Sequence, residues 1–346
     1  GMKVSSLLFA MSAIFLLSIS MGVSGQSNPY RNVNWATLPD GRTWGAVGDL
    51  DVAPDGEHIW AVVRCDATAL DRFGNECLDS DLDSILKFNK DGEVVESFGG
   101  GMFIWPHGID VDRDGNIYVT DAVSDGAIPD GDTRGHQVIK FSPTGDVLLV
   151  LGTPGVQGSA NDQFTSPADV VVADNGDIFI ADGHNNNGNN RVMKFDQNGQ
   201  FLMSWGQTGY GPSEFRALHT IAMDQRGRIF VGDRSNNRLQ LFEQDGTYIN
   251  QWTQFGRPSG IFFDEYDNIY VADSESDVEQ NPGWEMGIRI GDANLGWVDE
   301  FVLYAPGDPF VIRGTGAEFV AVDSAGNMFG GEPVPRNLQK YVKVRP

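Results

Sequence analysis

The chain has 346 residues, of which 48 are Asp or Glu and 24 are Lys or Arg, so its formal net charge is −24. Such an acidic chain repels polyanions, and we expect no nucleic-acid partner. Its hydrophobic fraction of 40% supports a sizeable core, and its 43 glycines accompany many short apolar runs. This combination favours an all-β repeat protein.

A targeting segment is expected over residues 1–25. Met2-Lys3 provides a short basic start, Leu7–Val23 is mostly apolar, and small residues precede Gln26 as a cleavage point. Gly1 before Met2 looks like a cloning remnant. The alternative is an uncleaved membrane anchor. We expect a secreted or periplasmic monomer with no membrane association after cleavage.

Two cysteines, Cys65 and Cys77, are present. In an exported chain, two cysteines twelve residues apart predict one disulfide that closes a surface loop. The alternative is two free thiols.

One sequence pattern recurs along the chain. Its clearest copy runs from Trp105 to Asp121 and continues, after an insertion, at 136–145. There, apolar runs at 109–111 and 117–119 flank an Asp-Gly turn, and two further strands are expected at 138–141 and 147–151. The other copies begin near Val47 (a degenerate copy), Pro167, Leu218, Pro258 and Ala317.

Six units of four strands predict a six-bladed β-propeller over residues 45–346, because radial repetition leaves only short exposed edges. The pattern matches the NHL repeat. The sixth unit lacks an outer strand after 338–344, and we expect the N-terminal segment 26–44 to complete it, with residues 28–40 forming the strand.

Strand order predicts which residues meet. The innermost strand of each unit starts at the channel mouth where the antiparallel second strand ends. The residues at the first of these two points are Gly48, His107, Ala168, His219, Ser259 and Glu318. Two imidazoles and a carboxylate suit Zn²⁺, and also Fe²⁺. The alternative is that each histidine only caps its strand by hydrogen bonding.

The second point carries Arg64, His184 and Arg234. The two arginines could clamp a carboxylate, or they could pair with neighbouring acids. His184 could be a third imidazole ligand or a general base. Aspartates recur at the second point and are expected to tie down the following loop through backbone N–H groups. They are Asp121, Asp182, Asp233 and Asp273.

Two segments carry a more specific resemblance: Pro106-His-Gly-Ile with His136-Gln-Val-Ile-Lys-Phe, and Leu218-His-Thr-Ile with Asp233-Arg234. Through them, residues 45–345 resemble the peptidyl-α-hydroxyglycine α-amidating lyases. The resemblance implies a Zn²⁺ held by three histidines. His107 and His219 match two of these, and Glu318 stands at the third.

The same resemblance implies the other site residues. His184 stands where the family has a tyrosine base, and Arg64 and Arg234 match its substrate-binding arginines. A structural Ca²⁺ is implied near Leu50 and Ile109, together with an Asp directly after the third histidine. Phe319 occupies that position here, so this calcium site is doubtful unless Asp49 or Asp51 substitutes.

The implied activity is that of an exported, metal-dependent carbon–nitrogen lyase. It would cleave a carbinolamide into an amide and glyoxylate, and its small-molecule or peptide substrate would carry a carboxylate. Two alternatives stay open because one propeller fold hosts many functions. One is a metal-dependent hydrolase of lactones or esters, and the other is a non-catalytic propeller that binds a protein or glycan.

Overall fold

The computed structural model describes residues 30–65, 75–123, 128–303, 316–334 and 336–344. The expected targeting segment, residues 1–25, lies outside the described residues. Over the described residues, helix is limited to the 3₁₀ turns η1 (Pro39–Gly41) and η2 (Arg234–Asn236). No helix in this part of the chain has the length and hydropathy needed to cross a membrane.

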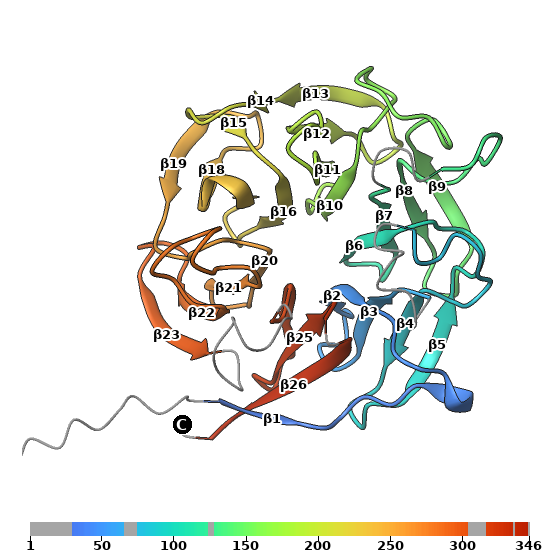
Figure 1. Cartoon of the computed structure of the whole chain (residues 1–346), viewed down its shortest axis with the longest axis horizontal. Helices are drawn as coiled ribbons and strands as arrows, with labels where there is room; N and C mark the ends of the chain where they lie inside the picture. Colours follow the sequence, from blue (N-terminus) through green and yellow to red (C-terminus); the bar gives the residue numbers. More distant parts are fainter. Residues whose placement is uncertain (1–29, 66–74, 124–127, 304–315, 335, 345–346) are drawn as a thin grey trace, which may run out of the picture.

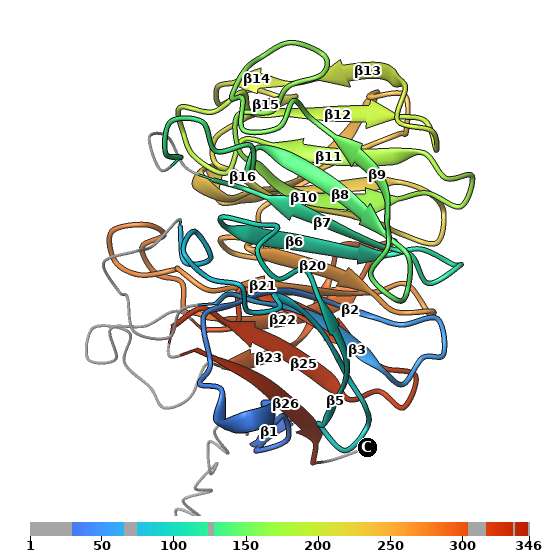
Figure 2. The ribbon, with the colours of Figure 1, turned by 90° about the vertical axis from the view of Figure 1, so that its right-hand side faces the viewer.

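Six four-stranded antiparallel sheets surround a central channel (Figure 1). In the side view the strands run across the thickness of the disc, so each inner strand starts at one face and ends at the other (Figure 2). The predicted all-β, six-bladed propeller is therefore confirmed. Apolar side chains on both faces of each sheet pack against the neighbouring blades, which buries a core between each pair of adjacent blades.

The strands of the first three blades are given from the channel outward. Blade 1 contains β2 (Val47–Val52), β3 (Ile59–Val63), β4 (Ile85–Phe88) and β5 (Val94–Phe98). Blade 2 contains β6 (Pro106–Val111), β7 (Ile117–Asp121), β8 (Gln137–Phe141) and β9 (Val147–Leu151). Blade 3 contains β10 (Pro167–Val172), β11 (Ile178–Asp182), β12 (Arg191–Phe195) and β13 (Phe201–Trp205).

The other three blades follow the same order. Blade 4 contains β16 (Leu218–Met223), β17 (Ile229–Asp233), β18 (Arg238–Phe242) and β19 (Tyr248–Trp252). Blade 5 contains β20 (Gly260–Phe263), β21 (Asn268–Asp273), β22 (Gly287–Asp292) and β23 (Val298–Leu303). Blade 6 contains β24 (Phe319–Val322), β25 (Met328–Glu332), β26 (Asn337–Lys343) and β1 (Tyr30–Val33). A short parallel pair, β14 (Gln207–Thr208) and β15 (Glu214–Phe215), links blades 3 and 4.

The ring closes through strands from opposite ends of the described chain. β1 pairs antiparallel with β26, with Tyr30 opposite Lys343 and Val33 opposite Lys340. The strand lies within the N-terminal segment that the sequence suggested for this place. Because the outer strand and the rest of blade 6 are far apart in sequence, this pairing joins the first and last parts of the propeller.

Carboxylates on the inner strands connect neighbouring blades. Asp49 of blade 1 accepts the backbone N–H of Ile109 in blade 2 at 2.9 Å. Asp169 of blade 3 accepts the N–H of Ile221 in blade 4 at 2.8 Å, as well as the Thr220 hydroxyl at 2.9 Å. The same link joins Asp51 to Val111 and Asp110 to Val172. These bonds satisfy inner-strand N–H groups that would otherwise be buried without a partner.

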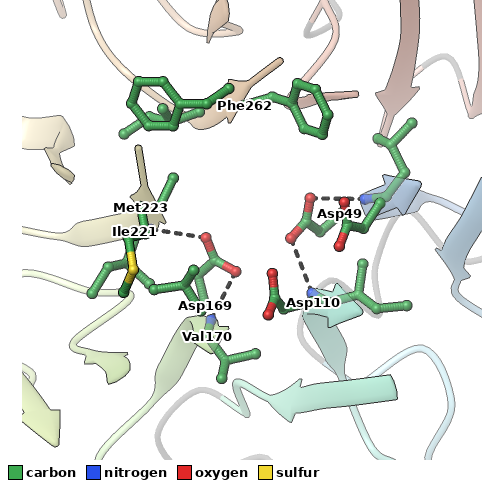
Figure 3. A pocket seen from close by; sticks show the side chains of 14 residues that line it. Asp49, Asp110, Asp169, Val170, Ile221, Met223 and Phe262 are labelled. Atoms are coloured by element: carbon green, nitrogen blue, oxygen red, sulfur yellow. Dashed lines mark hydrogen bonds between the residues drawn. The ribbon is translucent and has the colours of Figure 1, made fainter. Parts of the chain in front are cut away.

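The linking carboxylates converge on the channel. Asp49, Asp110 and Asp169 line a cavity of about 140 Å³ together with apolar side chains such as Phe262 (Figure 3). Burial raises the pKa of Asp169 to about 7, although the hydrogen bonds it accepts oppose this shift. Burial and the nearby Asp169 also hold the pKa of Asp49 well above its usual range.

The raised pKa of Asp169 predicts a pH-dependent stability. The folded protein binds this proton more tightly than the unfolded chain does, so the contribution is largest at low pH and is lost as pH rises toward 7. Between pH 5 and pH 8 we expect a loss of roughly 1–3 kcal/mol, or a few degrees in Tm. In Asp169→Asn, which cannot titrate, the change in Tm between these pH values should be smaller. Equal changes in wild type and variant, measured by thermal unfolding, would contradict this assignment.

Candidate active site

Two histidines start inner strands at one end of the channel, here called the histidine mouth. His107 is the second residue of β6 and His219 the second residue of β16, and neither is exposed. The Nδ1 atom of His107 lies 2.7 Å from the carbonyl oxygen of Ala168, and that of His219 lies 2.6 Å from the carbonyl oxygen of Ser259. A carbonyl can only accept, so Nδ1 carries the proton and Nε2 presents a lone pair.

A glycine allows this contact between blades. A Cβ at Gly108 would lie 2.6 Å from an oxygen of Asp169 and 2.7 Å from the carbonyl oxygen of Ala168. Only glycine therefore lets β6 approach β10 closely enough for the adjacent His107 to reach Ala168.

A third histidine joins the other two. His184 follows β11 and is 9% exposed, and its ring centroid lies 4.6 Å from that of His107 and 4.9 Å from that of His219. One ligand nitrogen from each of the three rings lies within 4.8 Å of the others. All three Nε2 atoms are buried and have no hydrogen-bond partner among the described residues. This is the donor arrangement that a metal ion would satisfy.

Glu318 lies at the edge of the histidine cluster. Its Oε1 is 3.0 Å from Nε2 of His219 and 3.8 Å from Nη1 of Arg234, and the residue is 5% exposed. Because Nδ1 of His219 carries the ring proton, Nε2 has no hydrogen to donate to Oε1 in the first contact. The sequence assigned Glu318 as the third metal ligand. The compact set of three donors instead contains His184.

The three imidazoles are held neutral. Burial, followed by the charge of a nearby histidine, lowers the pKa of both His107 and His184 well below its usual range. Burial and the charge of Arg234 do the same to His219. Neutral imidazoles are the form that binds a metal, so little deprotonation would be needed on binding.

Arg64 follows β3 at the same mouth and is completely buried. Its Nε donates to the carbonyl oxygen of Pro106 at 3.0 Å, and its guanidinium lies 4.5 Å from the ring centroid of Trp105. Nη1 is 3.9 Å from a Glu76 oxygen, and neither Nη atom makes a hydrogen bond within the described residues. A buried guanidinium with two unused donor groups is prepared for an anion.

Trp105 is a site residue that the sequence reasoning did not assign. Besides its contact with Arg64, its ring meets the edge of His184 at 4.8 Å between centroids and that of His107 at 5.2 Å. Phe319, which follows Glu318, stacks on His219 at 5.4 Å. In the sequence, Trp105 directly precedes Pro106-His107 and Phe319 directly follows Glu318. This adjacency to predicted site residues is the sequence signal that could have assigned them to the site.

The recurrent aspartates act differently from the expectation. Asp121 accepts the backbone N–H groups of Ile104 and Trp105, which precede the inner strand of the same blade. Asp182, Asp233 and Asp273 accept N–H groups from Thr165, Arg216 and Arg257, in the equivalent segments. Asp273 also accepts backbone N–H groups of its following loop, as expected. Asp182 and Asp233 instead accept side-chain amide N–H groups from their following loops, those of Asn189 and Asn236. They therefore fix mainly the segment entering each blade, because that segment lies beside the end of the second strand.

The predicted disulfide is present. Cys65 is bonded to Cys77, and both residues are buried. The bond directly follows Arg64 and holds Glu76, the neighbour of Cys77, within 3.9 Å of the Arg64 guanidinium. It therefore connects the end of β3 to a loop beside the histidine mouth.

Comparisons with known proteins agree with this architecture. The family description "NHL repeat" matches residues 164–195, and "Beta-propeller repeat" matches residues 104–120. The chain is therefore a six-bladed β-propeller that contains an NHL repeat at residues 164–195. A solved streptogramin B lyase shares its fold, with a TM-score of 0.54 and 12% identity over 90% of this chain and 97% of that one.

Several curated relatives match part of this propeller. Human NHL repeat-containing protein 3 is 36% identical over 57% of this chain and 52% of its own length. Peptidyl-α-hydroxyglycine α-amidating lyase 1 of Drosophila melanogaster is 35% identical over 34% of this chain and 20% of its length. Peptidyl-glycine α-amidating monooxygenase B of Xenopus laevis is 37% identical over 41% of this chain and 15% of its length. The chain thus spans about half the length of the first relative and less of the others.

The disulfide should contribute to stability. Closing a loop of about 13 residues is worth roughly 3 kcal/mol in the chain-entropy description. We expect Cys65→Ala/Cys77→Ala to have a lower Tm in thermal unfolding, and unreduced, denatured wild type to yield no titratable thiol. Two thiols per chain would show that the bond does not form in the purified protein.

Proposed function

We propose that the propeller is a metal-dependent lyase that cleaves an N-acyl-α-hydroxyglycine, a carbinolamide, into an amide and glyoxylate. The observation that carries the proposal is the convergence of three buried histidines at one mouth: one ligand nitrogen of each lies within 4.8 Å of the others. None of their Nε2 atoms makes a hydrogen bond among the described residues. The matched relatives named as amidating lyases and monooxygenases support a related chemistry.

The residues present fit a divalent metal. His107, His184 and His219 would hold it, and three neutral imidazoles suit Zn²⁺ best, with Fe²⁺ as the alternative. When bound, the metal would supply Lewis-acid chemistry at a substrate oxygen. The hydrogen bonds from Nδ1 of His107 and His219 to backbone carbonyls would orient these ligands.

The other side chains have separate tasks in this proposal. Arg64 would bind the substrate carboxylate through its unused Nη donors, with Trp105 beneath it. Glu318, the carboxylate beside His219, would accept the proton of the substrate hydroxyl. Loss of that proton forms the aldehyde of glyoxylate while the C–N bond breaks, and the departing nitrogen takes up a proton to become the amide.

A hydrolase of lactones or esters is the second candidate. The observation that favours it is the carboxylate of Glu318 beside the histidines, since a carboxylate in this place could equally deprotonate a water molecule. The Cys65–Cys77 bond supports an oxidising compartment, so we propose that the protein is exported.

The metal proposal predicts one Zn²⁺ or Fe²⁺ per chain in protein purified without chelators. Ala in place of His107, His184 or His219 should remove the metal while leaving the fold, because the apolar clusters between the blades contain none of these histidines. Elemental analysis and circular dichroism measure the two effects.

Two control variants sharpen this test. Glu318→Gln should keep its metal, whereas loss of metal would restore Glu318 to the ligand set. His58→Ala, at an exposed turn where His58 contacts Asp55 at 2.7 Å, should retain metal fully. Wild type without stoichiometric metal would exclude both enzyme candidates and leave the non-catalytic propeller.

The lyase proposal predicts glyoxylate release from an N-acyl-α-hydroxyglycine. Arg64→Ala should keep the metal but lower kcat/KM about ten- to hundredfold, because a charge-assisted contact is worth roughly 1.5–3 kcal/mol. A colorimetric glyoxylate assay gives the rates. If metal-loaded wild type forms no glyoxylate but opens a lactone, the hydrolase proposal replaces the lyase proposal.

A further inference from the structure

Two arginines lie next to the histidine mouth, between blades 4 and 5. Arg234 is the first residue of η2, and Arg257 lies in the segment that enters β20. Both are almost completely buried, at 8% and 6% exposure. The side chain of Glu275, in the loop after β21, is 32% exposed and lies between them.

The three residues contact one another, and Nη1 of Arg234 also lies 3.8 Å from Oε1 of Glu318. Arg257 donates from Nη1 to the backbone carbonyl of Arg234 at 2.9 Å and from Nε to Oε2 of Glu275 at 3.2 Å. Arg234 reaches Oε1 of Glu275 from Nη1 at 3.5 Å. Arg257 is therefore anchored at two points, and one carboxylate is shared by two guanidinium groups.

The contact between Arg234 and Glu275 is the weaker of the two. Charge-assisted N–H···O bonds are usually about 2.7–2.9 Å long, well below the 3.5 Å found here. The buried Nε of Arg234 has no hydrogen-bond partner in the described part of the chain. A carboxylate approaching Arg234 from the side could use Nε and one Nη together, which Glu275 does not do.

We propose that Arg234 and Arg257 form an anion subsite whose resident occupant is Glu275, and that a ligand carboxylate competes with Glu275 for Arg234. Glu275 is the part of this set with access to solvent, so it can swing outward while Arg257 stays in place. Arg64 differs from Arg234 because neither of its buried Nη atoms makes a hydrogen bond within the described residues. This inference deepens the proposed lyase function, and it adds Arg257 and Glu275 to the residues that set carboxylate affinity.

The test is the binding of N-acetylglycine to the purified holoprotein by isothermal titration calorimetry. This acid carries the carboxylate but lacks the hydroxyl, so it binds without reacting. Removing the competing charge in Glu275→Gln should tighten binding about 1.5- to fivefold, the range expected for a partly exposed ion pair. Glu279→Gln, an exposed acid of the same loop, makes the same change in net charge and should bind like wild type.

A double variant identifies Arg234 as the contested partner. In an Arg234→Gln background, Glu275→Gln should give no further gain in affinity, because the two substitutions act on one contact. Unchanged or weaker binding in Glu275→Gln, or an equal gain in Glu279→Gln, would overturn the proposal. Because binding is measured without turnover, the calorimetric result can be interpreted even if the glyoxylate assay fails. Equally, a negative calorimetric result does not affect the test of lyase activity.

Discussion

The contact between neighbouring inner strands is the constraint on which the rest of the structure depends. These strands surround the channel so closely that Gly108 has no room for a Cβ, and inner-strand N–H groups are satisfied by carboxylates from the preceding blade. The same closeness brings a backbone carbonyl of blade 3 within reach of His107 and one of blade 5 within reach of His219. Blade packing and site geometry therefore share one cause.

This arrangement prepares the histidines electrostatically. For His107 and His219, a carbonyl fixes the proton on Nδ1 and burial favours the neutral ring, so that Nε2 presents a lone pair. The cost is three buried nitrogen atoms that make no hydrogen bond within the part of the chain that the structure describes, which a structure normally avoids. Such unsatisfied atoms gathered at one point are a stronger indication of a ligand than the presence of histidines alone.

The charges at the mouth contrast with those of the whole chain. Although the net charge of the chain is −24, three arginines are buried at or beside this one mouth: Arg64, Arg234 and Arg257. Three glutamates lie near them: Glu76, Glu275 and Glu318. The opposite signs nearly balance, so a bound divalent cation would make the mouth attractive to an anionic ligand. The linking aspartates inside the channel have a different task, because their oxygens already accept N–H groups between blades, and the calcium expectation stays a prediction.

Sequence alone determined the propeller, its six units, the disulfide and the two positions at which site residues gather. These follow from local patterns: turn residues and alternating short strands repeat at a regular spacing, and strand direction places equivalent residues at one mouth. Tertiary structure decided which members of that set meet. His184 and Glu318 both stood at eligible positions, but loop conformation turns the His184 ring into the histidine cluster and leaves Glu318 between His219 and Arg234. The partners of Arg257 and Glu275 also depended on how blades 4 and 5 pack, because side-chain contacts between separate blades leave no periodic signal in the chain.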